Sequence, residues 1–468
     1  MKTAAAAALL ALLVVAAPAA ARERTVTMRA GPYTLGSFET VRPKVIVPSP
    51  RVDGAITYMH SRLVDRRRRP VTIKRVMLHH VVFINRGRFE GDRRPKCGAR
   101  FGEPFYGTGE ENQALRLPAG YGYRTRRGDI WKMQTMLMSH TRKVSKVWVE
   151  YRMRIRTGER FKHVTPYWVR VTNCRNEPSY SVPGGGPPGS HHLRTNLWRM
   201  PADGYIVAGG AHLHGGAHNI TIRQPSCRGR RLMASDPSYG MPGSLVYRVK
   251  PLLHEPGPIN TGWFMSRTGV AVRGGDMLRA TANYDAERAH PGVMGVWHVY
   301  IHHRRVRGPR CAPLPGDARE HLIKGPARPD PPAVHVPLTA LVGGRPTPID
   351  HPKGRLFYYG SPFDQPFVAV DDGRFKKVNL SVAAGTEITW RFQDRVAHKV
   401  SLVNGPRSMG SPTLAGGARY RRTFTVPGTY QLFCYLHPMT MHQEVVVRPG
   451  PLAAAAGEGS EARGIEAD

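Results

Sequence analysis

The chain has 468 residues, 41% of them hydrophobic, and its 69 Lys and Arg against 33 Asp and Glu give a formal net charge of +36. This length provides for two or three domains with cores of their own, and the hydrophobic content is that of an ordinary globular protein, not of a disordered one. With 50 Gly, 41 Pro and few long helical patterns, the composition favours an all-β fold class.

The positive charge alone would favour an anionic polymer, a membrane surface or a nucleic acid as partner. The basic residues are scattered, apart from Arg66 to Arg69, and no recognition-helix pattern or aromatic-interleaved basic motif accompanies them. We therefore expect no nucleic acid and name an anionic cell-surface polymer as a possible partner. The sequence also lacks a Gly-x-Ser-x-Gly motif, a phosphate-binding glycine loop and a His-Glu-x-x-His motif, so we do not expect a hydrolase.

The first 21 residues have the pattern of a secretory signal peptide. Lys2 supplies the positive start, Ala4 to Ala17 the apolar run, and small residues precede a cleavage point near Ala21. No later apolar stretch is long enough to span a bilayer. We therefore expect a secreted or extracytoplasmic protein, periplasmic or associated with the cell wall.

Runs rich in Pro and Gly divide the rest of the chain into segments. Short alternating runs such as Lys74 to Ile84 and Val144 to Arg156 indicate strands, and a Pro/Gly-rich connector covers Ser181 to Gly189. We predict two tandem β-sandwiches, over residues 22–180 and 191–311. A Pro-rich linker (312–360), a third β-sandwich (361–449) and a disordered tail (450–468) follow.

Histidines gather in the predicted strands of the front region. His79 and His80 are adjacent on one strand and so point to opposite faces, and they can share a metal only if the strand twists or bulges there. His140 ends another apolar strand and offers a third nitrogen. His212 and His214 are two apart, which places both imidazoles on one strand face, as chelation requires.

Met294, which opens a later strand, completes a series that resembles the ascorbate-dependent type II copper monooxygenases over roughly residues 60–311. The resemblance implies two tandem β-sandwiches with up to two type 2 coppers and a small reductant such as ascorbate. It implies an electron-storing copper on His79, His80 and His140. It also implies an oxygen-activating copper on His212, His214 and Met294.

The front region also resembles the stress up-regulated nodulin family, on Ala211 to Gly216 and Pro291 to Gly295, with Val149 to Arg152 before them. Two positions depart from the peptidylglycine enzymes. Gly210 and His298 stand where those enzymes have an Arg that holds the substrate carboxylate and a Tyr. Peptidylglycine is therefore not the expected substrate.

Cys434, His437 and Met441 lie within eight residues, in a segment that reads as strand, tight loop and strand. Thiolate, imidazole and thioether together suit copper, and His398 on another strand offers the missing imidazole. The segment from about Ser361 to Pro449 resembles the cupredoxins, the small blue-copper β-sandwiches.

The cupredoxin resemblance implies a type 1 copper on His398, Cys434, His437 and Met441. Met439 is a rival for the axial position. Met441 is preferred because its spacing to Val445–Val447 matches the way the last strand follows the axial Met in that family.

With Cys434 assigned to copper, four of the five cysteines remain, an even number that suits an oxidising compartment. We pair Cys97 with Cys174 and Cys227 with Cys311, although four cysteines allow three pairings.

The function expected from the sequence is an exported multi-copper redox protein, in which a blue-copper electron-transfer module serves a region that hydroxylates a small organic substrate. The alternative is a non-catalytic extracellular protein for copper binding, storage or tolerance.

Overall fold

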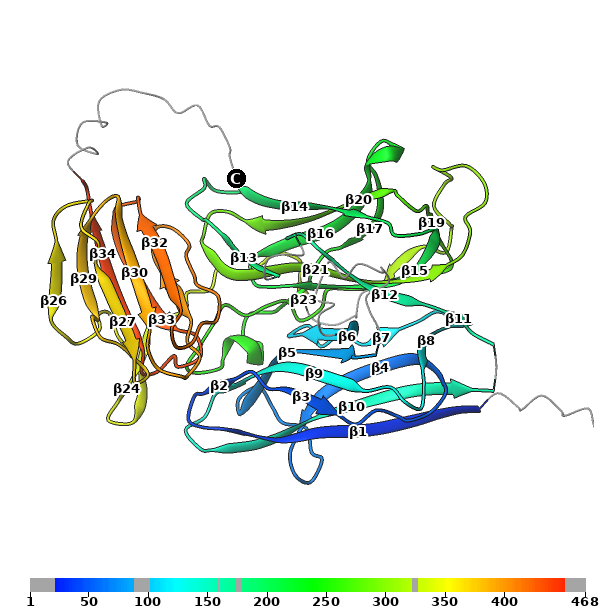
Figure 1. Ribbon diagram of the computed structural model, residues 1–468, viewed down its shortest axis with the longest axis horizontal. Helices are drawn as coiled ribbons and strands as arrows, with labels where there is room; N and C mark the ends of the chain where they lie inside the picture. Colours follow the sequence, from blue (N-terminus) through cyan, green and yellow to red (C-terminus); the bar gives the residue numbers. More distant parts are fainter. Residues whose placement is uncertain (1–21, 88–101, 159, 174–177, 322–326, 451–468) are drawn as a thin grey trace, which may run out of the picture.

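The computed structural model describes residues 22–87, 102–158, 160–173, 178–321 and 327–450, and it shows three β-sandwiches (Figure 1). The predicted all-β class is confirmed. Within the described ranges there is no α-helix, and the helical residues there belong to the short 3-10 turns η2 (Pro225–Cys227) and η3 (Leu245–Tyr247). Within the described residues, no helix is long and apolar enough to cross a membrane. The predicted signal peptide and nearly all of the predicted tail lie outside the described residues.

The first sandwich packs two antiparallel sheets around a core that includes Phe83, Trp131 and Tyr151. Alternate burial along β10 shows why this segment forms a strand with one face on the core. One sheet contains β1 (Arg22–Leu35), β10 (Ser145–Thr157), β4 (Gly54–Val64), β8 (Tyr121–Thr125), β11 (Lys162–His163) and β7 (Leu115–Arg116). The other contains β2 (Thr40–Val41), β3 (Lys44–Val47), β9 (Trp131–Ser139), β5 (Val76–Asn85) and β6 (Glu103–Gly109).

The second sandwich has a core around Trp297 and Tyr284. Its larger sheet contains β12 (Thr165–Arg170), β13 (Ser179–Val182), β21 (His290–His303), β15 (Gly204–Leu213), β19 (Trp263–Val272) and β22 (Arg319–His321). The smaller sheet contains β14 (His191–Arg199), β20 (Met277–Asp285), β16 (Ala217–Gln224) and β17 (Arg230–Ser235). A separate pair joins β18 (Tyr239–Gly240) to β23 (Ala327–Arg328).

The change from one sandwich to the next comes earlier than the sequence predicts. Strands β12 and β13 fall inside the predicted first domain, but both pair with β21 of the second sandwich. The chain therefore crosses over between His163 and Thr165. The Pro/Gly-rich run at 183–189, which suggested a boundary, is a loop between two strands of the second sandwich.

The third sandwich has a five-stranded and a four-stranded sheet over a core that includes Trp390 and Met441. The burial of β30 alternates strictly at its start, as expected for a strand with one face on the core. The larger sheet contains β26 (Leu356–Tyr359), β29 (Asn379–Ala383), β34 (His442–Arg448), β33 (Gly428–Cys434) and β31 (Val400–Asn404). The smaller contains β28 (Arg374–Phe375), β27 (Phe367–Asp371), β30 (Thr386–Phe392) and β32 (Arg419–Phe424).

The predicted linker carries more structure than expected. Strand β26 adds to the third sandwich by pairing in parallel with β29, and a hairpin of β24 (Thr339–Val342) and β25 (Arg345–Pro348) precedes it. The third sandwich therefore begins at Leu356, a few residues before the predicted start.

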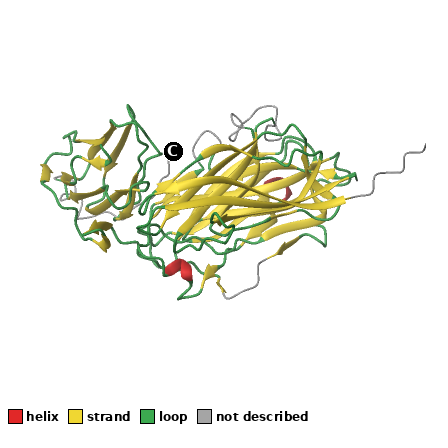
Figure 2. Ribbon diagram, turned by 90° about the horizontal axis from the view of Figure 1, so that it is seen from below, coloured by secondary structure: helices red, strands yellow, loops and turns green. Residues whose placement is uncertain are grey.

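The three sandwiches meet at one junction. The two front sandwiches lie face to face, and the third lies at their side (Figures 1 and 2). The Tyr300 hydroxyl of the second sandwich donates to the Phe105 carbonyl of the first at 2.9 Å. A buried cluster combines residues from all three regions: Phe38, Met77, Met136, Met138, Leu253 and Met439. The third sandwich is thus seated on the front pair.

One of the two predicted disulfides is confirmed. Cys227 in η2 is bonded to Cys311, with Cα atoms 5.4 Å apart and a sequence separation of 84. The other predicted pair, Cys97 with Cys174, lies outside the described residues. Among the residues that the structure describes, Cys434 is a free, buried cysteine.

Candidate metal centre

One loop and the segment just before a neighbouring strand of the third sandwich position Cys434, His437 and His398. Cys434 is the last residue of β33, and the loop behind it is closed by the bonds Cys434 N–H to Met441 O at 3.0 Å and His437 N–H to Cys434 O at 3.0 Å. His398 lies just before β31 and is held by a bridge to Leu414. Strands β31 and β33 are paired, so Val400 lies opposite Cys434 and brings His398 beside it.

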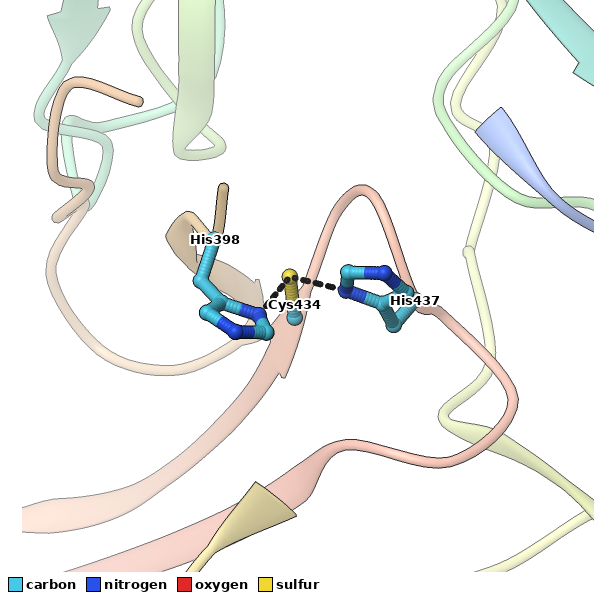
Figure 3. A group of neighbouring side chains, drawn as sticks. All are labelled: His398, Cys434 and His437. Atoms are coloured by element: carbon cyan, nitrogen blue, oxygen red, sulfur yellow. Dashed lines mark hydrogen bonds between the residues drawn. The ribbon is translucent and has the colours of Figure 1, made fainter. Parts of the chain in front are cut away.

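The three side chains converge on a common point (Figure 3). Cys434 Sγ lies 3.5 Å from His437 Nδ1 and 3.9 Å from His398 Nδ1. Donor atoms that share one ion through bonds of about 2.0–2.3 Å in a trigonal plane stand about 3.5–4.0 Å apart. The donor set and its spacing therefore fit a copper ion.

Two neighbours orient this group. Asp394 lies 2.7 Å from His398 Nε2, which leaves Nδ1 of that ring directed at the sulfur. The Lys399 N–H donates to Cys434 Sγ at 3.4 Å. Burial raises the pKa of the Cys434 thiol, so a thiolate here needs a nearby positive charge such as a metal ion. Burial likewise lowers the pKa of His437, which favours the neutral imidazole that binds metals.

A second collection of histidines lies between the two front sandwiches. His79 and His80 face one another with their Nδ1 atoms 3.3 Å apart, and the pairing of β5 with β9 shifts register between Leu78 and His80. This is the bulge that two adjacent histidines on a strand need in order to meet.

His212 and His214 enter the same collection from β15. Their Nε2 atoms lie 3.2 Å apart, and the His79 and His214 ring centroids lie 5.6 Å apart. His212 Nδ1 is 3.2 Å from Glu111, and a Cβ on Gly109 would lie 2.4 Å from His212 Cε1, so the two sandwiches approach closely here. Burial lowers the pKa of His212, but Glu111 outweighs it and the net shift is upward.

The structure places histidines of the two predicted front copper sites next to one another. The buried His79 and the partly buried His80, His212 and His214 form one continuous cluster. Loss of solvation holds the pKa of His79 and His214 well below the usual value and that of His80 at about 3. His140 is hydrogen-bonded through Nδ1 to the Ile73 carbonyl oxygen at 2.7 Å. No group of three converging His, Cys or carboxylate atoms within the described residues includes it.

Met294 approaches the cluster through its backbone. The Tyr284 hydroxyl donates to the Met294 carbonyl at 2.5 Å and accepts from the His214 N–H at 3.0 Å. His298, another position singled out in the sequence, stacks on Trp168 with ring centroids 4.8 Å apart.

Comparison with known families decides what the third sandwich is. Residues 368–448 match the copper binding proteins of the plastocyanin/azurin family. The C-terminal part of the chain is a cupredoxin domain. The predicted resemblance is confirmed for this part, and a cupredoxin domain implies copper.

Individual relatives of the cupredoxin domain are amicyanins. Amicyanin-alpha of Methylorubrum extorquens is 31% identical over 77 residues, which are 16% of this chain and 64% of amicyanin-alpha, just under two thirds of its length. The solved reduced Cu(I) form of an amicyanin mutant at pH 4 is 29% identical, with 18% of this chain and 81% of that chain covered and a TM-score of 0.17. A further reduced amicyanin mutant is 27% identical, with 19% and 83% covered and a TM-score of 0.17.

A second family match covers residues 169–304, which correspond to the stress up-regulated Nod 19 family. This range contains most of the second sandwich, including His212, His214 and Met294. The resemblance predicted from the Ala211 to Gly216 and Pro291 to Gly295 motifs is therefore confirmed for this sandwich.

Two residues close to the cluster were missed by the sequence reasoning. His254 and Glu110 lie with His79 in a group whose ligand atoms are all within 4.8 Å of one another. Glu110 directly follows β6, and His254 lies in an irregular stretch between η3 and β19. A carboxylate pair at a strand end, Glu110 and Glu111, was the available signal, while nothing periodic marks His254.

Proposed function

We propose that the protein is an exported one-electron carrier whose cupredoxin domain holds a type 1 copper on Cys434, His398 and His437, with Met441 as axial ligand. The observation that carries this proposal is the convergence of one sulfur and two imidazole Nδ1 atoms on a single point, with Cys434 and His398 buried and His437 partly buried. Copper bound by thiolate and imidazole supplies a reversible one-electron couple.

The surrounding residues of the cupredoxin domain support that chemistry. The Lys399 N–H donates to Cys434 Sγ and so stabilises negative charge on the sulfur. Asp394 fixes the His398 ring. Cys434 and His398 are fully buried, which keeps water from the sulfur and limits rearrangement when the charge of the site changes.

The same loop points to the two front sandwiches as the redox partner within the chain. Tyr435 donates to Met138 Sδ at 3.7 Å, and Met439 packs beside Met77 and Met136. Arg42 of the first sandwich donates to Thr413 Oγ1 at 2.7 Å. A carrier seated on its partner in this way exchanges electrons without a diffusional encounter.

One experiment tests the carrier role. Protein loaded with Cu(II) should show intense thiolate-to-copper absorption, lose it on addition of ascorbate, and regain it with an added one-electron oxidant. Zinc-loaded protein is the matched control and should stay colourless throughout, since zinc has no redox change. If the absorption of the copper-loaded protein does not change on addition of the reductant, the proposal is refuted.

The front cluster favours a second candidate function, hydroxylation of a small organic substrate with ascorbate as reductant. It is favoured because four histidines of the two front sandwiches meet in one cluster: His79, His80, His212 and His214. Oxygen uptake by copper-loaded protein in ascorbate should fall strongly in His214→Ala. Equal uptake by both proteins would exclude catalysis. Copper uptake without oxygen consumption would support the alternative, a copper storage or tolerance protein.

Export forms the last part of the proposal and rests on the first 21 residues. Their charge, apolar run and small-residue end are those of a cleaved signal. Mass analysis of protein made in a host with a secretory pathway should find a chain that starts near Arg22 outside the cytoplasm. Full-length protein retained in the cytoplasm would contradict export. The net charge of +36 would then also favour salt-sensitive adhesion to anionic surface polymers.

A further inference from the structure

His254, Glu110 and His79 bring three ligand atoms to one point where the two front sandwiches and the cupredoxin domain meet. His254 Nε2 lies 3.4 Å from Glu110 Oε1, and His79 Nε2 lies 3.6 Å from the same oxygen. Met77 Sδ lies 3.2 Å from His254 Nε2. Donor atoms that share an ion through bonds of about 2.0–2.3 Å at tetrahedral angles stand about 3.3–3.8 Å apart, which matches this spacing.

Hydrogen bonds on the outer side of the group orient His254 and Glu110 inward. His254 Nδ1 lies 2.9 Å from the Glu255 carbonyl oxygen, which can only accept, so Nδ1 carries the proton and Nε2 of the neutral ring carries the lone pair. Glu110 Oε2 accepts the Gly257 N–H at 2.9 Å and leaves Oε1 for the histidines. Such bonds to a carbonyl or an amide are the usual way in which metal ligands are held in place.

His254 and Met77 contact one another through two acceptor atoms. The Nε2 lone pair of a neutral imidazole and a thioether sulfur are both acceptors, so no proton joins them at 3.2 Å. A cation between them satisfies both. Burial also raises the pKa of Glu110 to about 8 and lowers that of His254, so this place favours a negative carboxylate only when a positive charge is beside it.

We propose that His79, Glu110 and His254 bind a second copper ion, with Met77 as a neighbouring thioether. Imidazole and carboxylate suit several metals, whereas a thioether selects copper and favours its reduced form. This ligand set differs from both sets predicted from the sequence, because it joins two sandwiches and includes Glu110 and His254.

The position of the second site relates it to the first. Tyr435 follows Cys434 directly, and its ring centroid lies 6.2 Å from that of His79. Tyr435 is also the residue whose hydroxyl donates to Met138 Sδ in the shared methionine cluster. The ligand set stands independently of the electron-carrier role, while the use of this short connection rests on that proposed function.

The test is a copper count on full-length protein, with metal analysis and paramagnetic resonance after unbound copper has been removed. Wild-type protein should hold about two copper ions per chain, and the double variant His254→Ala, Glu110→Gln about one, with the visible absorption of the Cys434 site unchanged. That absorption also reports that the cupredoxin domain is folded. His192→Ala, a histidine on the edge strand β14, is the matched control and should keep both ions.

Cys434→Ser separates this inference from the proposed function. It should remove the visible absorption and leave about one copper ion, which the further changes at His254 and Glu110 then remove. A double variant that binds as much copper as wild type, or a site that retains zinc in preference to copper, would overturn the inference even if Cys434 binds copper as proposed. Loss of copper on changing His254 and Glu110, with no effect of Cys434→Ser, would leave the inference standing and refute the carrier role.

Discussion

Met441 and Met439 lie two positions apart in the loop after Cys434, yet they are buried in different cores. Met441 belongs to the core of the cupredoxin domain together with Cys434. Met439 belongs to the cluster that joins this domain to the front sandwiches, with Met77 and Met138. The loop therefore presents one methionine to the sulfur site and uses the other to dock the domain, which favours Met441 as the axial ligand.

This difference predicts unequal effects of the same substitution. Met441→Leu should keep the visible absorption and raise the reduction potential, on the order of 60 mV or more, because the axial thioether tunes the site. Met439→Leu is the matched control and should leave the potential unchanged, since it replaces one buried apolar side chain by another of similar volume. Potentiometric titration followed by absorption measures both. A shift with Met439→Leu and none with Met441→Leu would reverse the assignment.

Asp394 offers a test of how the cupredoxin site is held. Asp394→Asn removes the carboxylate that orients His398, so copper affinity should fall about 10–100-fold with the fold intact. Competition against a chelator of known affinity measures the change. Asp371→Asn, at an exposed carboxylate with a 3.8 Å ion pair to Lys376, serves as control and should bind copper normally. Equal affinities in all three proteins would show that Asp394 has no part in the site.

The sequence predicted which side chains the cupredoxin domain brings together, because their placement follows from local spacing. Cys434, His437 and Met441 lie in or next to one loop, and His398 lies just before a strand that pairs with β33. His254 and Glu110 could not be placed in the same way, because they meet His79 only when two sandwiches pack together. Likewise, β12 follows the first sandwich closely in sequence, and only its pairing with β21 assigns it to the second.

His290 gives the second sandwich a pH-dependent stability. It is buried, with Glu255 2.6 Å from Nδ1 and Asp285 3.6 Å from Nε2; burial lowers its pKa, but the two carboxylates outweigh burial and nearby Arg288 and raise it to about 9. Because this pKa lies above the value of 6.5 in the unfolded chain, the stabilisation is fully present below about pH 6.5 and disappears as pH rises through about 9.

The corresponding variant is His290→Gln. Between about pH 6.5 and 9 the free energy of unfolding of wild type should fall by about 1.4 kcal/mol per pH unit from this group, and the variant should lack that component. Denaturant unfolding at a series of pH values measures it. Identical pH profiles for variant and wild type would show that His290 is not charged in the folded protein.

The disulfide between Cys227 and Cys311 should stabilise the second sandwich alone. It closes a loop with a sequence separation of 84, so replacing both cysteines by Ser should lower the free energy of unfolding by about 2–5 kcal/mol. Tryptophan fluorescence mainly follows the front sandwiches, which contain six of the seven Trp, and the visible absorption of the copper-loaded protein follows the cupredoxin domain. We expect the first transition to move and the second to stay. Movement of the copper transition by the same amount would mean that the domains unfold as one unit.

The central claim, that Cys434 binds a redox-active copper, is tested most directly by the visible spectrum of copper-loaded wild type and of Cys434→Ser. The sulfur lies within 4 Å of two imidazole nitrogens, so wild type should show intense thiolate-to-copper absorption. Cys434→Ser should lose that absorption while far-ultraviolet circular dichroism shows an unchanged β fold. An absorption that persists in Cys434→Ser, or a wild-type protein that binds copper without colour, would contradict the account.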